Sequence, residues 1–467
     1  MSKIFKTLTL TTALIGSGLF IGQSVAMAQT LPEAVAQTLQ TNPEILAEAN
    51  RRLSVDKTID QAKAGYLPQV DLDLGYGHEY TNNPATRPPG GRSLNRGEAG
   101  IAAKQMIYDG FYTKSEVDRT TSSAESAGYA VSDISESTSL QAVDAYLNIL
   151  RRQELMAITQ TNLDAHERIG DMIEKRAESG VGRRADVDQI QARLALSRAN
   201  VVSEEGNIED ARSQYLRVVG NLPENITDPG DGCCDRAPAT VDEAISVAIN
   251  QHPYLRSALA THEASLAQVQ GAKSAFHPKV DFDLSYRSDN NLNADGDNLL
   301  RNEGHQKELQ AMTRLQQNLY NGGADSARVA QFESLSEQQK QQVIRAQRQI
   351  EQDVRLAWNA LQTAQERVPK LKQRLEAAEK TRTAYEDQFG IGQRTLLDLL
   401  DSENELLIAG ADYTEAYYNQ LFACYWLAES MGQLLDALEL QHREEAITVA
   451  GSTAEQEETT AADTVID

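Results

Sequence analysis

Positive charge is scarce in this sequence of 467 residues. Lysine and arginine together number 44, against 68 aspartates and glutamates, which gives a formal net charge of -24 at pH 7. Such a chain lacks the basic face that holds a polyanion, so the sequence predicts no nucleic-acid partner. Proteins and cations are the partners that its charge favours.

Histidine is also rare. The seven histidines are scattered, and they form no HExxH motif or other paired ligand spacing. No nucleophile, base and metal ligand occur together in a recognisable arrangement. We therefore predict no enzyme activity, no catalytic residue, no metal site and no cofactor.

Cysteine is too rare for a disulfide framework, with three residues in the chain. Cys233 and Cys234 are adjacent in a segment rich in Gly, Asp and Pro, whereas Cys424 lies in an apolar helical stretch. We interpret the three as structural residues. A disulfide between the two adjacent cysteines is the lesser alternative.

Long apolar runs are confined to the first residues. Lys3 and Lys6, an apolar run and the small-residue pattern Ala26-Met27-Ala28 predict a secretory signal peptide over residues 1–28. Beyond it, no apolar run reaches the roughly 18 residues of a membrane-spanning helix. Any membrane crossing is therefore expected to use β-strands.

The remaining chain contains one unit twice. "TLPEAVAQTLQTNPEILAEA" aligns with "TVDEAISVAINQHPYLRSAL", and "AKAGYLPQVDLDLGY" aligns with "AKSAFHPKVDFDLSY". Farther along, "SGVGRRADVD" aligns with "FGIGQRTLLD" at the same spacing. We predict two structural repeats, 29–220 and 240–440, joined by a linker over 221–239 and followed by an acidic disordered tail over 441–467.

Each repeat contains a pair of amphipathic strands. Period-two alternation predicts strands at about 69–80 and 95–108, and again at about 279–287 and 308–319. Four carboxylates alternate with apolar residues in the first strand of each pair: Asp71, Asp73, Asp281 and Asp283. Alternation explains these pairs better than acid-base or metal chemistry does, so we expect them to line a wet face of the sheet.

Long helices fill the rest of each repeat. Apolar residues at steps of three and four predict helices over 113–179, 185–220, 325–389 and 395–432, and a further helix from Leu31 to Gly65. The longest helix would measure about 100 Å at roughly 1.5 Å per residue. The helices over 31–65 and 185–220 are about half as long, so two of them laid end to end match one long helix. The strands then lie at one end and the glycine turns at the other.

The glycine turns are interpreted as mechanical parts. Gly180, Gly182, Gly390 and Gly392 follow a helix rather than a strand, and no Lys-Ser/Thr comes after them. A phosphate-binding loop requires both features, so a tight turn between helices is the better interpretation.

Four strands cannot close a barrel, and lipid does not tolerate open strand edges. Two chains would give eight strands and a barrel filled by side chains, whereas three would give twelve strands around a lumen. The predicted fold class is mainly α with a membrane β-barrel portion: a trimeric 12-stranded barrel continuous with a long α-helical coiled-coil tunnel.

The signal peptide, the two-fold repeat, "GYLPQVDLDLGYG", "NLYNGGADSARV" and "FGIGQRTLLDLLDSENELL" resemble the TolC family of outer-membrane channels. The segments "GVGRRADVDQIQARLALSRAN" and "AWNALQTAQERV" are most similar to the type I secretion branch of this family. The resemblance implies a homotrimer in outer-membrane lipid, with its helical tunnel in the periplasm. Its partners would be a periplasmic adaptor protein, an inner-membrane ABC transporter and a secreted protein substrate passed on unfolded.

The resemblance also implies a gate at the periplasmic tip. Arg394, Asp398 and Asp401 correspond to the family's constricting arginine and aperture aspartates, and Asp188 to the aspartate that pairs with that arginine. Phe389 stands where a tyrosine is expected, so a hydroxyl-mediated gate bond should be missing. Asp398 also has a local interpretation, because Thr395 and Asp398 have the spacing of a helix capping box.

Two alternatives share parts of this evidence. A channel serving a drug or small-molecule efflux pump would have the same fold, and the sequence does not record the cargo. A coiled-coil envelope spacer without a pore would have the helices, but the four amphipathic strands argue against it.

Overall fold

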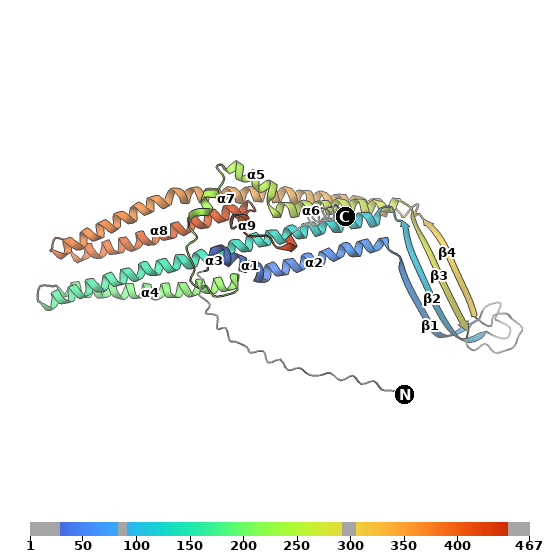
Figure 1. Ribbon diagram of the computed structural model, residues 1–467, viewed down its shortest axis with the longest axis horizontal. Helices are drawn as coiled ribbons and strands as arrows, with labels where there is room; N and C mark the ends of the chain where they lie inside the picture. Colours follow the sequence, from blue (N-terminus) through green and yellow to red (C-terminus); the bar gives the residue numbers. More distant parts are fainter. Residues whose placement is uncertain (1–28, 83–90, 292–304, 447–467) are drawn as a thin grey trace, which may run out of the picture.

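The structure is a computed structural model that describes residues 29–82, 91–291 and 305–446. The predicted signal peptide and residues 447–467 of the predicted tail lie outside the described residues. The chain is elongated, with a four-stranded sheet at one end and two helical hairpins at the other (Figure 1). Among the described residues, no helix has the length and apolar character to cross a membrane.

The first helical segment of each repeat is broken at a proline. The expected continuous helix from Leu31 to Gly65 is wrong, because α1 (Leu31–Thr41) and α2 (Pro43–Lys63) meet at Asn42. Proline disfavours the helical conformation of the preceding residue, and Asn42 is extended. The second repeat has the same break between α5 (Val241–Gln251) and α6 (Pro253–Lys273).

Strands of both repeats form one antiparallel sheet in the order β1-β2-β3-β4. The elements are β1 (Gln69–Thr81), β2 (Arg92–Tyr108), β3 (Lys279–Asn291) and β4 (His305–Gln316). The β2–β3 pairing joins the two repeats, with Ile101 opposite Tyr286. Residues 317–319, expected in the last strand, lie beyond its end.

Two long helices carry the chain from the sheet to the glycine turns. They are α3 (Tyr112–Glu178) and α7 (Ala324–Gly390), each of 67 residues. The returning helices are α4 (Arg184–Val219) and α8 (Leu396–Ser430), so that each repeat ends in an antiparallel hairpin (Figure 1). Short elements close the middle of the molecule: η2 (Asp231–Arg236), α9 (Leu434–Ala437) and η4 (Glu444–Ala446). The prediction of disorder is wrong for residues 441–446, because Arg443 donates to the carbonyl of Leu39 at 2.8 Å and so holds this segment on α1.

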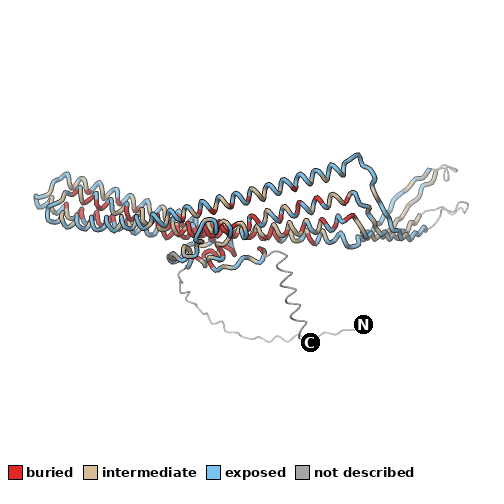
Figure 2. Tube along the Cα trace, turned by 90° about the horizontal axis from the view of Figure 1, so that it is seen from above, coloured by how far each residue is buried: buried red, intermediate tan, exposed pale blue. Residues whose placement is uncertain are grey.

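Buried residues concentrate in the middle of the molecule and continue into the hairpins (Figure 2). The central core contains Tyr146 from α3, Tyr215 from α4 and Leu421 from α8. The hydroxyl of Tyr146 donates to the carbonyl of Thr227 at 2.7 Å and accepts from its N–H at 3.0 Å. The linker between the repeats is therefore held against the long helix of the first repeat.

A disulfide also fixes the linker. Cys234 is bonded to Cys424 of α8, with Cα atoms 5.1 Å apart across a sequence separation of 190 residues. A bond between the adjacent cysteines, considered above, is therefore wrong, and Cys233 keeps a free thiol. The sequence did not indicate this pair because only the packing of η2 on α8 brings the two cysteines together.

We expect Cys424→Ser to lower the free energy of unfolding by about 2–4 kcal/mol. The disulfide closes a long loop and so restricts the unfolded chain, and the variant loses that restriction. Thermal unfolding in detergent, with and without reductant, measures the effect. Reductant should lower the midpoint of the parent protein and leave the variant unchanged.

Cys233→Ser is the matched control, and its midpoint should stay near that of the parent protein. Burial raises the pKa of the Cys233 thiol to about 12, so alkylation at pH 8 should also be slow in the folded protein. Equal losses of stability from both variants would contradict the assignment of the bond.

Candidate functional site

The two glycine turns close the helical hairpins. Gly180 and Gly392 have φ angles of 79° and 78°, a left-handed conformation that residues with a Cβ rarely adopt. In the first turn, the N–H groups of Val181 and Gly182 donate to the carbonyl of Arg176 at 3.1 Å and 2.9 Å. A Cβ on Gly182 would lie 2.7 Å from the nitrogen of Ala177, so this close approach also requires glycine.

Gly390 has a different part in the second turn. It is the last residue of α7, its φ is not positive, and a Cβ built on it would meet no atom within 4 Å. The turn itself is made by hydrogen bonds from Gly392 to Phe389 at 3.1 Å and from Gln393 to Gln388 at 2.9 Å. Both glycine-rich stretches are thus interhelical turns, and neither has the strand before it that a phosphate loop requires.

A small apolar core supports both turns. Its buried residues come from all four hairpin helices, and include Ile173 of α3, Ile190 of α4, Phe389 of α7 and Leu400 of α8. Phe389, which stands where a tyrosine was expected, is 4% exposed and serves as a packing residue. Its contribution lies in the ring rather than in a polar group.

Arg394 is held within its own hairpin. Its Nε donates to Oε1 of Gln388 at 3.0 Å, and its guanidinium carbon lies 4.1 Å from the ring centroid of Tyr385. Asp188 is exposed on α4, and no ion pair to it occurs within the described part of the chain. The structure of one chain therefore does not bring these two residues together.

The aperture aspartates lie on α8. Asp398 forms the capping box with Thr395, accepting from its N–H at 3.1 Å and from its hydroxyl at 2.9 Å. Those hydrogen bonds hold the pKa of Asp398 below its usual value, with a smaller contribution from the charge of Arg394. The local capping role proposed from the sequence is confirmed, and the carboxylate remains charged at neutral pH.

Asp401 reaches the other hairpin. Its carboxylate lies 3.6 Å from Nη2 of Arg193 on α4. Arg193 was not singled out from the sequence, and no sequence pattern would have indicated it. A contact between helices of different repeats depends on how the two hairpins are packed.

A buried polar chain crosses all four helices between the tip and the middle of the molecule. The hydroxyl of Ser197 on α4 donates to Oδ1 of Asn162 on α3 at 3.2 Å, and Nδ2 of Asn162 donates to the carbonyl of Glu403 on α8 at 3.4 Å. The Glu403 carboxylate, 3% exposed, then accepts from Nε of Arg382 on α7 at 2.6 Å. This chain was also missed at the sequence level.

At the other end of the molecule, the sheet has one polar and one apolar face. Directly opposed residues of antiparallel strands share a face. The apolar face is exposed in the single chain and carries Val70, Leu72, Leu74, Tyr76, Ile101, Phe282, Leu284, Tyr286, Leu309 and Leu315.

The predicted strand carboxylates lie on the polar face. Asp281 pairs with Lys104 at 3.0 Å, and Asp283 pairs with Arg314 at 2.8 Å. Asp71 and Asp73 lie opposite Ala102 and Gly100, which offer them no charge. The structure therefore divides the four residues into a paired set on β3 and a set on β1 without a basic neighbour across the strand.

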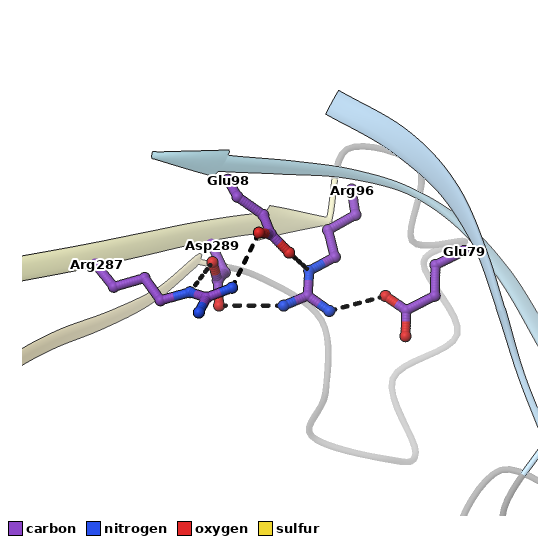
Figure 3. A network of polar contacts seen from close by, with 5 residues as sticks. All are labelled: Glu79, Arg96, Glu98, Arg287 and Asp289. Atoms are coloured by element: carbon purple, nitrogen blue, oxygen red, sulfur yellow. Dashed lines mark hydrogen bonds and ion pairs between the residues drawn. The ribbon is translucent and has the colours of Figure 1, made fainter. Parts of the chain in front are cut away.

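A second charged group on this face was not predicted. Arg96 contacts Glu98 at 2.6 Å, Glu79 at 3.0 Å and Asp289 at 3.5 Å (Figure 3). Arg287 contacts Glu98 and Asp289 at 2.9 Å and 3.0 Å. Two arginines thus share two carboxylates across β2 and β3, near the strand ends farthest from the helices.

The family described as "Outer membrane efflux protein" matches residues 34–221 and 244–433. The chain belongs to this outer membrane efflux protein family. The two matched segments correspond to the two repeats. This efflux protein is a channel protein of the outer membrane rather than an enzyme, with its helical tunnel on the periplasmic side.

Two outer-membrane proteins are similar to this chain over most of its length. The efflux protein is 25% identical over 441 residues to the outer membrane efflux protein BepC of Brucella suis, covering 94% of this chain and 93% of BepC. It is 25% identical over 434 residues to the outer membrane protein TolC of Escherichia coli, covering 90% of this chain and 86% of TolC.

Solved structures agree on the fold. The outer membrane channel CmeC of Campylobacter jejuni superposes with a TM-score of 0.74 at 14% identity, covering 92% of this chain and 89% of CmeC. The fold class predicted from the sequence, a mainly helical chain of two repeats that supplies four strands to a trimeric barrel and tunnel, is confirmed. The efflux protein thus has a membrane end at the sheet and a tip at the glycine turns.

The buried chain behind the tip gives a test of how the hairpins hold together. We expect Arg382→Ala to destabilise the efflux protein by about 3 kcal/mol, because the buried carboxylate of Glu403 loses its charged partner. The thermal midpoint in detergent measures the loss. Arg355→Ala is the matched control, since Arg355 forms an exposed pair with Glu351, and its midpoint should barely move.

Proposed function

We propose that this efflux protein is the outer-membrane duct of a tripartite type I secretion system. Three chains would supply twelve strands, and unfolded protein would pass from an inner-membrane ABC transporter and a periplasmic adaptor through the tunnel to the exterior. The duct itself would supply no energy. The separation of polar and apolar faces on the sheet carries this proposal, because the apolar face suits lipid and the polar face suits a wet lumen.

Protein cargo is supported by the names of relatives. The proteases secretion protein PrtF of Dickeya chrysanthemi is 22% identical over 428 residues, covering 88% of this chain and 89% of PrtF. The alkaline protease secretion protein AprF of Pseudomonas aeruginosa is 20% identical over 423 residues.

Small-molecule efflux is the second candidate. It is favoured by the higher identity to BepC, which is named an efflux protein. The two candidates share one duct and differ in the transporter that delivers the cargo.

We further propose that the tip is a gate. Asp398 is partly exposed, Asp401 is exposed, and the two are three residues apart on one helix, so three-fold symmetry would gather six carboxylates around the axis. Such a ring attracts cations. Arg394 of one chain would face Asp188 of the next and hold the tip shut, while Gly180, Gly182, Gly390, Gly392 and Phe389 would form the turns that move.

The strand carboxylates would act at the membrane end. Asp71, Asp73, Asp281 and Asp283 would face the lumen and keep it wet and acidic. The exposed apolar residues of the opposite face would contact outer-membrane lipid. Lys104 and Arg314 pair with Asp281 and Asp283. Asp71 and Asp73 would therefore be the more negative part of this surface.

Single-channel conductance in planar bilayers tests the gate. We expect Asp188→Ala combined with Arg394→Ala to raise the conductance, because the lock between chains would be lost. We expect millimolar divalent cation on the tip side to reduce the conductance of the parent protein, and Asp398→Asn with Asp401→Asn to abolish that block.

Asp186→Ala combined with Arg184→Ala is the matched control, because it removes the same charges from the same turn region outside the proposed lock. A conductance that rises equally in the control would remove the support for a specific Asp188–Arg394 contact. Folded trimers that conduct no ions in any variant would contradict the duct.

Cargo class is tested by the partners. The full chain, tagged and cross-linked in its own cells, should retain a periplasmic adaptor together with an ABC transporter, and its deletion should remove a protein from the culture medium. Another tagged outer-membrane protein treated in the same way is the control. Recovery of a proton-driven pump in place of the ABC transporter, with an unchanged set of secreted proteins, would favour small-molecule efflux.

A further inference from the structure

Arg176 joins the two glycine turns of one chain. Its backbone is part of the first turn, where its carbonyl oxygen accepts hydrogen bonds from the N–H groups of Val181 and Gly182. Its side chain reaches the second turn, where Nη2 lies 3.5 Å from the carbonyl oxygens of both Phe389 and Gly390. One residue therefore contributes its backbone to one hairpin and its charge to the other.

The second turn provides a suitable site for a cation. The last carbonyls of a helix lack partners within it and carry a partial negative charge. α7 has no basic residue in its last turn, so it does not neutralise this end by itself. Phe389 and Gly390 are its last two residues, and Arg176 supplies the missing positive charge from α3.

Aromatic stacking strengthens the contact. The guanidinium carbon of Arg176 lies 4.6 Å from the ring centroid of Phe389, within the range of a cation–π interaction. The ring is 4% exposed, and such interactions gain strength as water is excluded. Phe389 thus binds a partner through its ring face, although it lacks the hydroxyl expected at that position.

Beside the apolar core, the other arginine contacts at the tip do little to join the hairpins. Arg394 contacts Gln388 and Tyr385, which belong to its own hairpin. Arg193 and Asp401 do connect the hairpins, but their charged atoms are 3.6 Å apart and the Asp401 side chain is 62% exposed. Exposed pairs of this kind contribute little.

We propose that Arg176 is a positioning residue of the gate, and that it clasps the end of α7 to α3 so that the two hairpins of each chain stay together in the closed tip. This inference rests on the proposed gate. Opening that separates the hairpins must remove the guanidinium from Phe389 and from the end of α7. The clasp acts within a chain, whereas the proposed Asp188–Arg394 lock acts between chains.

The test uses Arg176→Gln, with Lys175→Gln as the matched control. Lys175 is the adjacent residue, is exposed and loses the same charge, but its side chain forms no hydrogen bond or ion pair with α7 among the described residues. Spin labels on cysteines placed at Val181 and Ile391, which are 83% and 72% exposed, report the distance between the turns in the full-length protein. Conductance is measured in parallel.

We expect Arg176→Gln to raise the ratio of separated to joined hairpins about tenfold, the effect of losing one partly desolvated cation–π contact with its hydrogen bonds. The label distances should broaden and the conductance should rise, whereas Lys175→Gln leaves both unchanged. Arg176→Lys should recover part of the effect. Phe389→Leu should change the label distances less in the Arg176→Gln background than in the parent protein, because the cation–π contact is already lost there.

Unchanged label distances in Arg176→Gln would overturn the clasp, and so would an equal response in Lys175→Gln. Far-ultraviolet circular dichroism and trimer content confirm that each variant is folded. The label distances test the clasp even when no variant conducts ions, so that failure of the clasp and failure of the duct give different results.

Discussion

The antiparallel pairing of β2 with β3 is the contact on which the rest of the architecture depends. It joins strands that are almost 200 residues apart in the chain into one sheet, and it leaves β1 and β4 as the outer strands. Outer strands carry unpaired backbone groups, which lipid does not tolerate, so the sheet requires further copies of itself. Next to this pairing α3 packs beside α6, and at the opposite end the two hairpins share a small apolar core.

The two ends of the molecule are stabilised in different ways. At the sheet, backbone hydrogen bonds fix the strands, and charged side chains such as Arg96 and Arg287 link neighbouring strands on the polar face (Figure 3). At the turns, a small apolar core is surrounded by arginine contacts with carboxylates, rings and carbonyls. Polar contacts of this kind can be broken and made again at lower cost than a packed core, which would suit the proposed gate.

The middle of the molecule is the most firmly held region. Buried residues concentrate there, and the linker between repeats is tied both to Tyr146 and, through a disulfide, to α8 (Figure 2). A rigid centre would allow the proposed movement of the hairpins at one end without disturbing the strand pairing at the other. Long helices such as α3 and α7 connect the two ends directly, since each passes the centre without a break.

The sequence by itself determined the elements and their repetition. Period-two alternation identified the strands, steps of three and four identified the long helices, and the spacing of Thr395 and Asp398 identified a capping box, because each pattern depends on neighbours within a few residues. The break at Asn42 was missed although Pro43 was visible, since the helical pattern continued across it. Only the tertiary structure decided which distant residues meet: Cys234 with Cys424, Arg193 with Asp401, Arg382 with Glu403, and Arg176 with Phe389. Those contacts join residues of different repeats or helices, and their distances depend on how the helices pack rather than on any local pattern.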